Sequence, residues 1–184
     1  MLDYRDVLDE ILVPEDALQA RVRELGAAIS RDYAGQDLLL LCILRGGVMF
    51  LSDLMRSLTI PHAIDFMALS SYGAGARASS GQVRISLDVN QNIQGRHVLV
   101  VKDIVDTGRT IAAVLDILAT RHPASLKICA LLDKSGRREV PVPIHYVGFD
   151  IPNKFVFGYG LDLDELFRNL PFVGVVKPEV ILKP

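Results

Sequence analysis

Two uninterrupted apolar runs, Leu38–Leu44 and Val98–Val101, limit the folds open to this chain more than any other feature. Neither run contains the regularly spaced polar residues that a half-exposed strand or helix requires. They therefore predict strands that are buried on both faces, as strands are in a parallel sheet covered by helices. A third run, Leu126–Leu132, contains one lysine and otherwise has the same character. Together the runs predict an α/β fold.

Helix-like segments separate these runs. Pro14 is followed by two acidic residues and then by apolar residues three or four apart, a pattern typical of a helix start. The predicted helices span about 14–34, 46–57 and 109–121, and the predicted strands 38–44, 63–69, 98–101, 126–132 and 144–149. This alternation predicts a mostly parallel twisted sheet with helices on both faces. The last forty residues are less regular and rich in aromatics.

Composition excludes several classes of protein. The chain has 184 residues, 50% of them hydrophobic and 23% charged, which indicates one globular domain over residues 1–184. Twenty basic and 22 acidic residues give a net charge of −2, so we expect no nucleic-acid partner. We expect no membrane partner either, because no apolar stretch approaches the roughly 20 residues that span a bilayer. Without a signal-like N-terminus, and with Cys42 and Cys129 inside apolar runs, the sequence predicts a soluble cytoplasmic protein with reduced core cysteines.

The segment 98–110 (VLVVKDIVDTGRT) carries the strongest chemical signal. A buried strand ends in acids and turns into a helix at Gly108, and ligands of parallel sheets bind beyond the carboxyl ends of the strands. A helix N-terminus offers unpaired N–H groups, and Thr107 and Thr110 add hydroxyls, so the turn suits a phosphate monoester. Asp, Thr and Gly are also common capping residues, and an ordinary strand-to-helix turn explains this part of the pattern equally well.

Two carboxylates beside this turn sharpen its interpretation. Asp103 and Asp106 flank a place where a phosphate is expected, and an anion there is unfavourable without a purpose. Such acids would have a function if they contacted sugar hydroxyls, a metal ion or a developing cation.

The segment resembles the signature of type I phosphoribosyltransferases, which bind phosphoribosyl pyrophosphate (PRPP). Further motifs narrow the resemblance to the hypoxanthine-guanine phosphoribosyltransferases and extend it over almost the whole chain. These motifs are Leu44-Arg45-Gly46-Gly47, Ser70-Ser71-Tyr72-Gly73, Lys134, Lys154-Phe155-Val156, Gly158-Tyr159, Leu161-Asp162 and Phe167-Arg168.

The resemblance implies an enzyme of purine salvage. It would transfer the 5-phosphoribosyl group of PRPP to N9 of hypoxanthine or guanine, giving IMP or GMP and pyrophosphate, with Mg²⁺ as cofactor. It also implies the type I phosphoribosyltransferase fold, a flexible catalytic loop over about 70–82 and a small purine-binding hood over about 150–184. The family is usually dimeric or tetrameric, so a homodimer or homotetramer is expected.

The resemblance also assigns roles to individual residues. Asp106 would be the general base facing the purine, or would stabilise charge there. The implied 5′-phosphate ligands are Asp106, Thr107, Gly108, Arg109 and Thr110, with Asp103 on the ribose. Pyrophosphate would contact Arg45, Gly46, Ser71, Tyr72 and Arg168, and the purine Ile104, Lys134, Phe155, Val156 and Asp162. Asp162 would also hold the metal, a cis peptide would join Leu44 to Arg45, and Asp164 and Glu165 are expected to be plain surface acids.

One position departs from the family pattern. Where the family usually has a second acid before Asp103, this chain has Lys102. Neighbouring residues of a strand point to opposite faces, so we expect the Lys102 ammonium to point away and leave the ribose to Asp103 alone. The alternative is that Lys102 replaces a ribose acceptor with a cation, which would repel Mg²⁺ and attract pyrophosphate.

Two further functions stay open at this point. The first is a PRPP-sensing regulator that keeps the fold and binds RNA or DNA, although the presence of Asp106, Lys134, Phe155 and Asp162 and the net charge of −2 favour the enzyme. The second is an enzyme that prefers xanthine. Backbone groups near Val156 and Asp162 would read the purine 2-position, so side chains do not decide between these bases.

Overall fold

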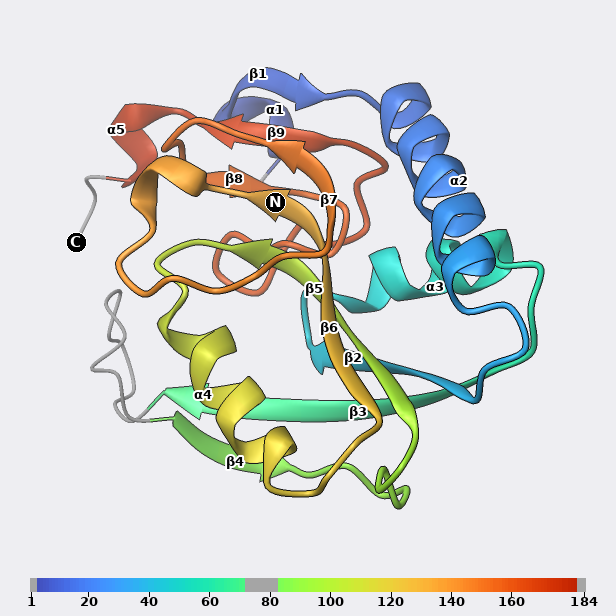
Figure 1. Cartoon of the computed structure of the whole chain (residues 1–184). Helices are drawn as coiled ribbons and strands as arrows, with labels where there is room; N and C mark the ends of the chain where they lie inside the picture. Colours follow the sequence, from blue (N-terminus) through green and yellow to red (C-terminus); the bar gives the residue numbers. More distant parts are fainter. Residues whose placement is uncertain (1–2, 72–82, 182–184) are drawn as a thin grey trace.

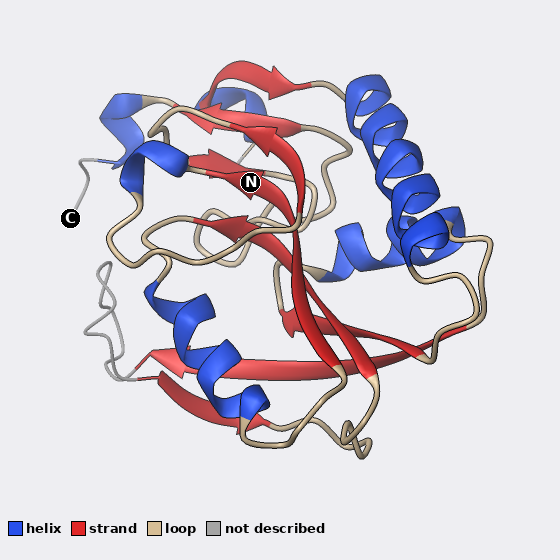
Figure 2. Cartoon of the chain, in the orientation of Figure 1, coloured by secondary structure: helices blue, strands red, loops and turns tan. Residues whose placement is uncertain are grey.

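Six strands form the central sheet of the computed structural model, which describes residues 3–71 and 83–181. The sheet has the order β4-β3-β2-β5-β6-β7. Figure 2 draws the strands in red. Its strands are β2 (Leu38–Leu44), β3 (His62–Ser71), β4 (Val83–Leu87), β5 (His97–Val105), β6 (Ser125–Asp133) and β7 (Tyr146–Asp150). All neighbouring strands are parallel except β3 and β4, which are antiparallel. The predicted mostly parallel sheet is confirmed.

Helices cover both faces of this sheet, which explains the uninterrupted apolar runs. The helices α2 (Glu15–Asp32) and α3 (Val48–Ser57) lie on one face and α4 (Arg109–Ala119) on the other (Figure 1). Successive residues of β5 alternate between the two layers. Leu99 and Val101 belong to the core under α2 and α3, whereas Val98 and Val100 belong to the core under α4. Because each face meets a helix layer, a polar residue in these strands would lose its contact with water.

A second, three-stranded antiparallel sheet has the order β1-β9-β8. Its strands are β1 (Leu8–Val13), β8 (Val156–Phe157) and β9 (Val173–Val176), with the short helices α1 (Tyr4–Val7) and α5 (Pro178–Ile181) beside it. The resemblance implied a hood over about 150–184, and the sheet also includes β1 from the other end of the chain. Most residues of β1 are exposed or half-exposed, so its sequence has no clean alternation to reveal a strand.

The predicted boundaries agree with the observed ones to within a few residues. The last strand of the central sheet lies over 146–150 rather than 144–149, and neither β4 nor the 3₁₀ turn η1 (Ser135–Arg137) was predicted. The expected loop over about 70–82 begins with residues 70–71, which end β3. The rest of that loop, including Tyr72, lies outside the described residues.

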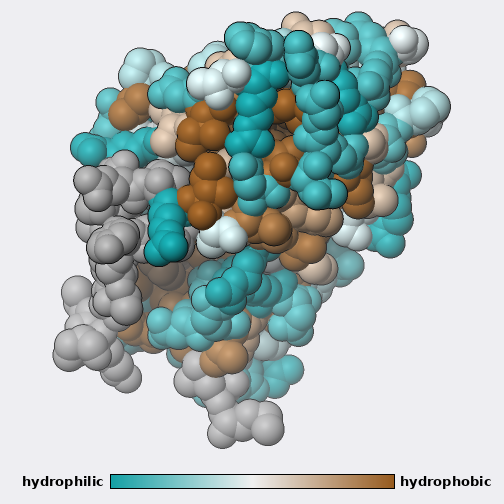
Figure 3. Space-filling model, turned by 90° about the horizontal axis from the view of Figure 1, so that it is seen from below, coloured by the Kyte–Doolittle hydropathy of each residue, from teal (hydrophilic) through white to brown (hydrophobic). Residues whose placement is uncertain are grey.

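Cys42 and Cys129 are free and buried, as predicted. Burial raises the pKa of the Cys42 thiol to about 12. Within the described residues, no helix has the length and apolar character needed to span a membrane. On the face shown in Figure 3, hydrophilic and hydrophobic residues are interspersed.

Candidate active site

The carboxyl ends of β2, β5 and β6 meet at one edge of the central sheet, where ligands of parallel sheets bind. Three loops follow these strand ends, over residues 45–47, 106–108 and 134–140. Most of the described candidate residues of the sequence lie on these loops, at the end of β5, at the start of α4 or in the segment that includes and follows β8. The topology therefore collects into one region motifs that are far apart in the chain.

The loop after β5 forms a small cavity at the start of α4. The cavity has a volume of about 180 Å³ and is lined by Lys102, Ile104, Val105, Asp106, Thr107, Gly108, Thr110 and Ile111. Gly108 has φ +87°, and a Cβ there would lie 2.4 Å from the Val140 carbonyl oxygen, so only glycine fits the turn. The predicted phosphate cup is thus a real concavity at a helix N-terminus.

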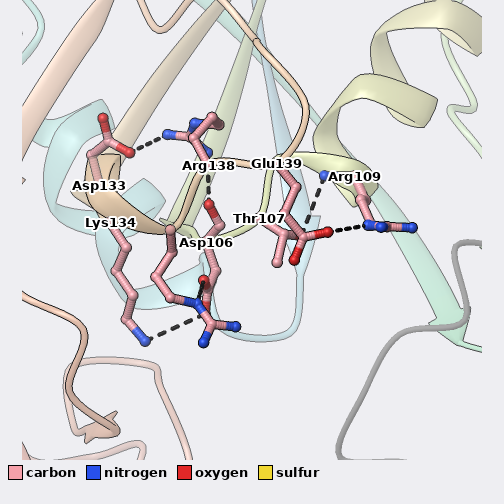
Figure 4. A network of polar contacts seen from close by, with 8 residues as sticks. Asp106, Thr107, Arg109, Asp133, Lys134, Arg138 and Glu139 are labelled. Carbon is pink, nitrogen blue, oxygen red and sulfur yellow. Dashed lines mark hydrogen bonds and ion pairs between the residues drawn. The ribbon is translucent and has the colours of Figure 1, made fainter.

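Arg109, also predicted for the phosphate cup, is placed differently. Its side chain leaves the cavity, and its Nε donates to Glu139 at 2.6 Å (Figure 4). Its backbone N–H lies 3.4 Å from the Thr107 hydroxyl. Arg109 is accordingly absent from the residues that line the cavity.

A second loop braces the first from behind (Figure 4). The Thr107 carbonyl accepts hydrogen bonds from the backbone N–H groups of Glu139 and Val140, at 2.9 and 3.0 Å. Arg138 donates to the Asp106 carbonyl at 3.0 Å and forms an ion pair with Asp133. These contacts fix the path of the phosphate loop without using any group that faces the cavity. Sequence reasoning missed Arg138, because nothing nearby in the sequence links it to residues 106–107.

Asp106 and Lys134 come together, as the proposed roles require. The Lys134 ammonium lies 3.4 Å from one Asp106 carboxylate oxygen, and the Arg137 guanidinium lies 3.2 Å from the other. Lys134 is buried, whereas Asp106 stays partly open to solvent. A carboxylate and an ammonium thus stand side by side next to the cavity at the start of α4, which Asp106 lines. Arg137 was not predicted, since it follows Lys134 in a polar turn without a distinguishing pattern.

Asp103 is buried against the loop after β2. One carboxylate oxygen accepts a hydrogen bond from the Ile104 N–H at 2.9 Å. The other packs on Gly46 so closely that a Cβ there would lie 1.7 Å away. Gly46 is therefore required by a side chain of the neighbouring strand, which the sequence alone did not reveal.

The expectation for Lys102 was wrong. Its side chain lines the phosphate cavity, and its ammonium forms an ion pair with Asp103 instead of pointing away. The strand alternation holds at the Cβ atoms, but the flexible lysine stem bends round the strand end. The buried Asp103 carboxylate requires a counter-ion, and Lys102 supplies it.

Two of the residues predicted for pyrophosphate, Arg45 and Arg168, meet through Glu165, an acid that is exposed as expected. Glu165 forms ion pairs with Arg45, at 2.7 Å, and with Arg168, at 3.1 Å. Arg168 also pairs with Asp162 at 3.0 Å. The Leu44–Arg45 peptide bond is cis, as the resemblance implied. Ser71 ends β3, and the structure describes only its backbone.

Three of the residues predicted for the purine, Phe155, Val156 and Asp162, lie at the hood, whereas Ile104 lies on β5 and Lys134 follows β6. Phe155 is 49% exposed and lines a cavity of about 440 Å³ together with Asp162 and Glu165. Val156 is buried and pairs with Val175 in the three-stranded sheet. An exposed aromatic ring beside a cavity is available for stacking on a planar ligand.

A hydrogen-bond cluster ties this hood to the central domain. The Tyr159 hydroxyl donates to Asp53 of α3 at 2.6 Å, and Gln19 and Arg56 donate to the same carboxylate. Burial raises the pKa of Asp53, but these hydrogen bonds outweigh it and hold the pKa below its usual value. Gly160 packs on the Gly46 carbonyl, where a Cβ would lie 2.1 Å away. The hood thus rests directly on the loop after β2.

Known proteins share this architecture. The model of the phosphoribosyl transferase domain matches residues 10–164. A hypoxanthine-guanine phosphoribosyltransferase of Mycobacterium avium is 48% identical over 183 residues, covering 96% of this chain and 90% of that protein. The hypoxanthine phosphoribosyltransferase of Escherichia coli K12 is 46% identical over 169 residues, covering 91% of this chain and 94% of the relative.

Solved structures agree with these sequence matches. The crystal structure of a hypoxanthine phosphoribosyltransferase from Staphylococcus aureus superimposes with a TM-score of 0.93 and 42% identity, covering 98% of this chain and 97% of that chain. A substrate complex of the Trypanosoma cruzi enzyme gives a TM-score of 0.89 and 43% identity, with coverages of 96% and 99%. Likeness of this degree in both sequence and structure places the chain among the hypoxanthine-guanine phosphoribosyltransferases, as a member of the phosphoribosyltransferase family.

Proposed function

We propose that the protein transfers the 5-phosphoribosyl group of PRPP to N9 of hypoxanthine or guanine and releases pyrophosphate. The observation that carries this proposal is the pairing of Asp106 with Lys134 at 3.4 Å, beside the cavity at the start of α4 that Asp106 lines. A purine stacked on Phe155 would present its O6 to the lysine and a ring nitrogen to the carboxylate.

The donor character of Lys134 determines which purine bases fit the site. Lys134 carries three donors and no acceptor, so it suits the O6 acceptor of a 6-oxopurine. Adenine has an amino group at that position, which would place donor against donor and leave the buried Lys134 without the acceptor that O6 supplies. Such mismatches cost about 1–3 kcal/mol and more for charges. The enzyme should therefore reject adenine.

Phosphate and pyrophosphate would bind on either side of the reacting carbon. The cavity at the start of α4 would hold the 5′-phosphate through N–H groups and the hydroxyls of Thr107 and Thr110. Arg45 and Arg168 would bind pyrophosphate. Both guanidiniums pair with Glu165 in this structure, so these contacts would have to be exchanged for contacts to the ligand.

The residues present fit Mg²⁺, which commonly binds one or two carboxylates together with substrate phosphates. Asp162 would hold it, because its carboxylate is one-third exposed at the edge of the hood cavity. When bound, the ion would neutralise negative charge on pyrophosphate.

In the reaction, the bond from C1′ to the pyrophosphate oxygen breaks as the bond from N9 to C1′ forms. The bonding electrons leave with pyrophosphate, and the purine loses a ring proton, which Asp106 accepts. Lys134 stabilises the negative charge that the base develops at O6. Because C1′ becomes cation-like, water must be excluded, and we assign this task to the segment 70–82.

Steady-state release of pyrophosphate with PRPP and each of four bases tests the proposal. We expect turnover with hypoxanthine, guanine or both, and none with adenine. The same experiment measures xanthine, whose recognition depends on backbone groups of the hood. Absence of pyrophosphate release with every base, from protein that binds PRPP, would favour the PRPP-sensing regulator instead.

We further propose that the enzyme works in the cytoplasm as a homodimer or homotetramer. Val48 and Met49, in the first turn of α3, are 41% and 37% exposed and offer apolar surface for a contact between copies. Light scattering of the purified protein would give its mass, and a monomer would contradict this assembly.

A further inference from the structure

Lys102 occupies an unusual position for a cation at this sheet edge. Its side chain is 17% exposed, and its ion-pair partner Asp103 is 8% exposed. A lysine so far removed from water needs anions around it. The ammonium carries three N–H donors, and Asp103 provides an acceptor on one side of it.

Partners for the remaining donors of the ammonium would come from the phosphate cavity, which Lys102 also lines. Among the described residues that line it, Lys102 is the one cation and Asp106 the one anion. The neighbouring arginine, Arg109, is turned outward to Glu139. A phosphate dianion that entered the cavity would otherwise meet the Asp106 carboxylate with only N–H groups and hydroxyls to balance it.

We propose that Lys102 is a substrate-binding residue of this enzyme, whose ammonium bridges Asp103 and the phosphoribosyl group held in the cavity. The proposal rests on the proposed function insofar as that group binds in this cavity. It explains why a lysine is tolerated beside a metal-dependent site. Its charge is already offset by Asp103, and its remaining donors face a ligand that is anionic.

A lysine at position 102 would act on the ligand differently from the acid that the family usually has there. An acid could only accept hydrogen bonds from ribose hydroxyls, and it would add negative charge beside a phosphate. A lysine adds attraction that needs no metal ion. Binding of ribose 5-phosphate in the presence of a chelator should therefore depend on Lys102.

The test is calorimetric titration of ribose 5-phosphate and, separately, of inorganic pyrophosphate, both in excess EDTA. Lys102→Met should weaken ribose 5-phosphate about 10- to 100-fold, since hydrogen bonds between charged groups contribute that much, and should leave pyrophosphate within about 2-fold. Lys102→Arg should keep most of the affinity. Lys127→Met is the matched control, because Lys127 is also a strand lysine but contacts the Tyr33 ring in the core.

Removal of Lys102 also leaves Asp103 without its counter-ion, which could destabilise the fold. The pair Asp103→Asn and Lys102→Met/Asp103→Asn avoids this, because neither protein retains the buried carboxylate. Comparison of these two proteins isolates the contribution of the ammonium to the ligand. Their thermal unfolding midpoints establish that both are folded.

Equal affinities of this pair for ribose 5-phosphate would overturn the proposal. So would a loss confined to pyrophosphate, which would move Lys102 to the leaving-group side. The titration contains no purine, so its outcome is independent of which base the enzyme accepts. A protein that binds ribose 5-phosphate through Lys102 but releases no pyrophosphate would refute the proposed reaction and keep this inference.

Discussion

At the scale of single residues, Asp106 lines the cavity at the start of α4 and pairs with Lys134 at 3.4 Å. Asp106→Asn keeps the shape of the side chain and removes its capacity to accept a proton. We expect kcat to fall about 10²- to 10⁴-fold, the usual contribution of a positioned base. The affinity for PRPP should change far less, because the loop backbone and the hydroxyls of Thr107 and Thr110 remain.

Rapid-quench and steady-state kinetics measure the first effect, and equilibrium dialysis of PRPP measures the second. Asp116→Asn is the matched control, since Asp116 lies on the exposed face of α4, the helix that begins at this loop. Turnover of Asp106→Asn close to that of the control would remove Asp106 from the role of base.

The position of a residue could be predicted from the sequence where a motif fixes it. Contacts between side chains could not be predicted in this way. Asp106 and Lys134 follow strands and lie as expected. Glu165 is the exposed acid that was expected, but no local pattern reveals that it joins two arginines. Lys102 was misjudged because strand alternation fixes the Cβ atom, whereas a four-carbon stem decides where the charge goes.

At the scale of elements, the loop after β6 holds the loop after β5 through Arg138. Arg138→Lys keeps the charge but loses the fork that reaches both Asp133 and the Asp106 carbonyl. We expect the binding of ribose 5-phosphate to weaken about 10-fold, corresponding to roughly 1.4 kcal/mol, with a smaller effect on the KM for hypoxanthine.

Arg21→Lys is the control for this prediction. Arg21 also donates to backbone carbonyls, those of Val147 and Gly148, but on β7 and away from the cavity. Both variants should lose stability, and only Arg138→Lys should lose phosphate affinity. Equal affinities in the two proteins would show that Arg138 acts on the fold alone.

The cluster around Asp53 makes the joint between hood and central domain sensitive to acid. The pKa of Asp53 is lowered in the folded protein, so its contribution to stability is present above its ordinary pKa, near 4. That contribution is lost as the pH falls through the lower folded value. Asp53→Asn should therefore reduce the free energy of unfolding most between pH 5 and 7, by about 1.5 kcal/mol or more.

Urea unfolding of both proteins between pH 3 and 7 measures this difference, which should narrow below about pH 4. Asp116→Asn again serves as the exposed control and should show no such dependence. A difference that stays constant down to pH 3 would mean that the hydrogen bonds of Asp53 do not depend on its charge.

At the scale of the whole molecule, the central sheet could be predicted because burial on both faces leaves an unmistakable mark on Leu38–Leu44 and Val98–Val101. The hood could be predicted only in part. Its strands are short, and one of them lies near the N-terminus, so the pairing of β1 with β9 joins residues at least 160 positions apart. Such pairing depends on long-range register, which local periodicity does not encode.

The hood should therefore depend on β1 in a way that the phosphate cavity does not. Ile11 lies on β1 opposite Gly174 of β9, and its side chain is 50% exposed. Ile11→Pro removes the backbone N–H donor and disrupts the strand pairing. Ile11→Ala also removes most of the isoleucine side chain but keeps the backbone N–H.

We expect Ile11→Pro to speed amide hydrogen exchange in β9 and to raise the KM for hypoxanthine about 10-fold or more, because Phe155 and Val156 sit on the weakened sheet. Ribose 5-phosphate should bind within about 2-fold of its original affinity, since the loops after β5 and β6 belong to the other sheet. Ile11→Ala should change neither measurement. If Ile11→Pro weakened both ligands equally, the hood and the central domain would have to unfold as one unit, and the separation of base binding from phosphate binding would be lost.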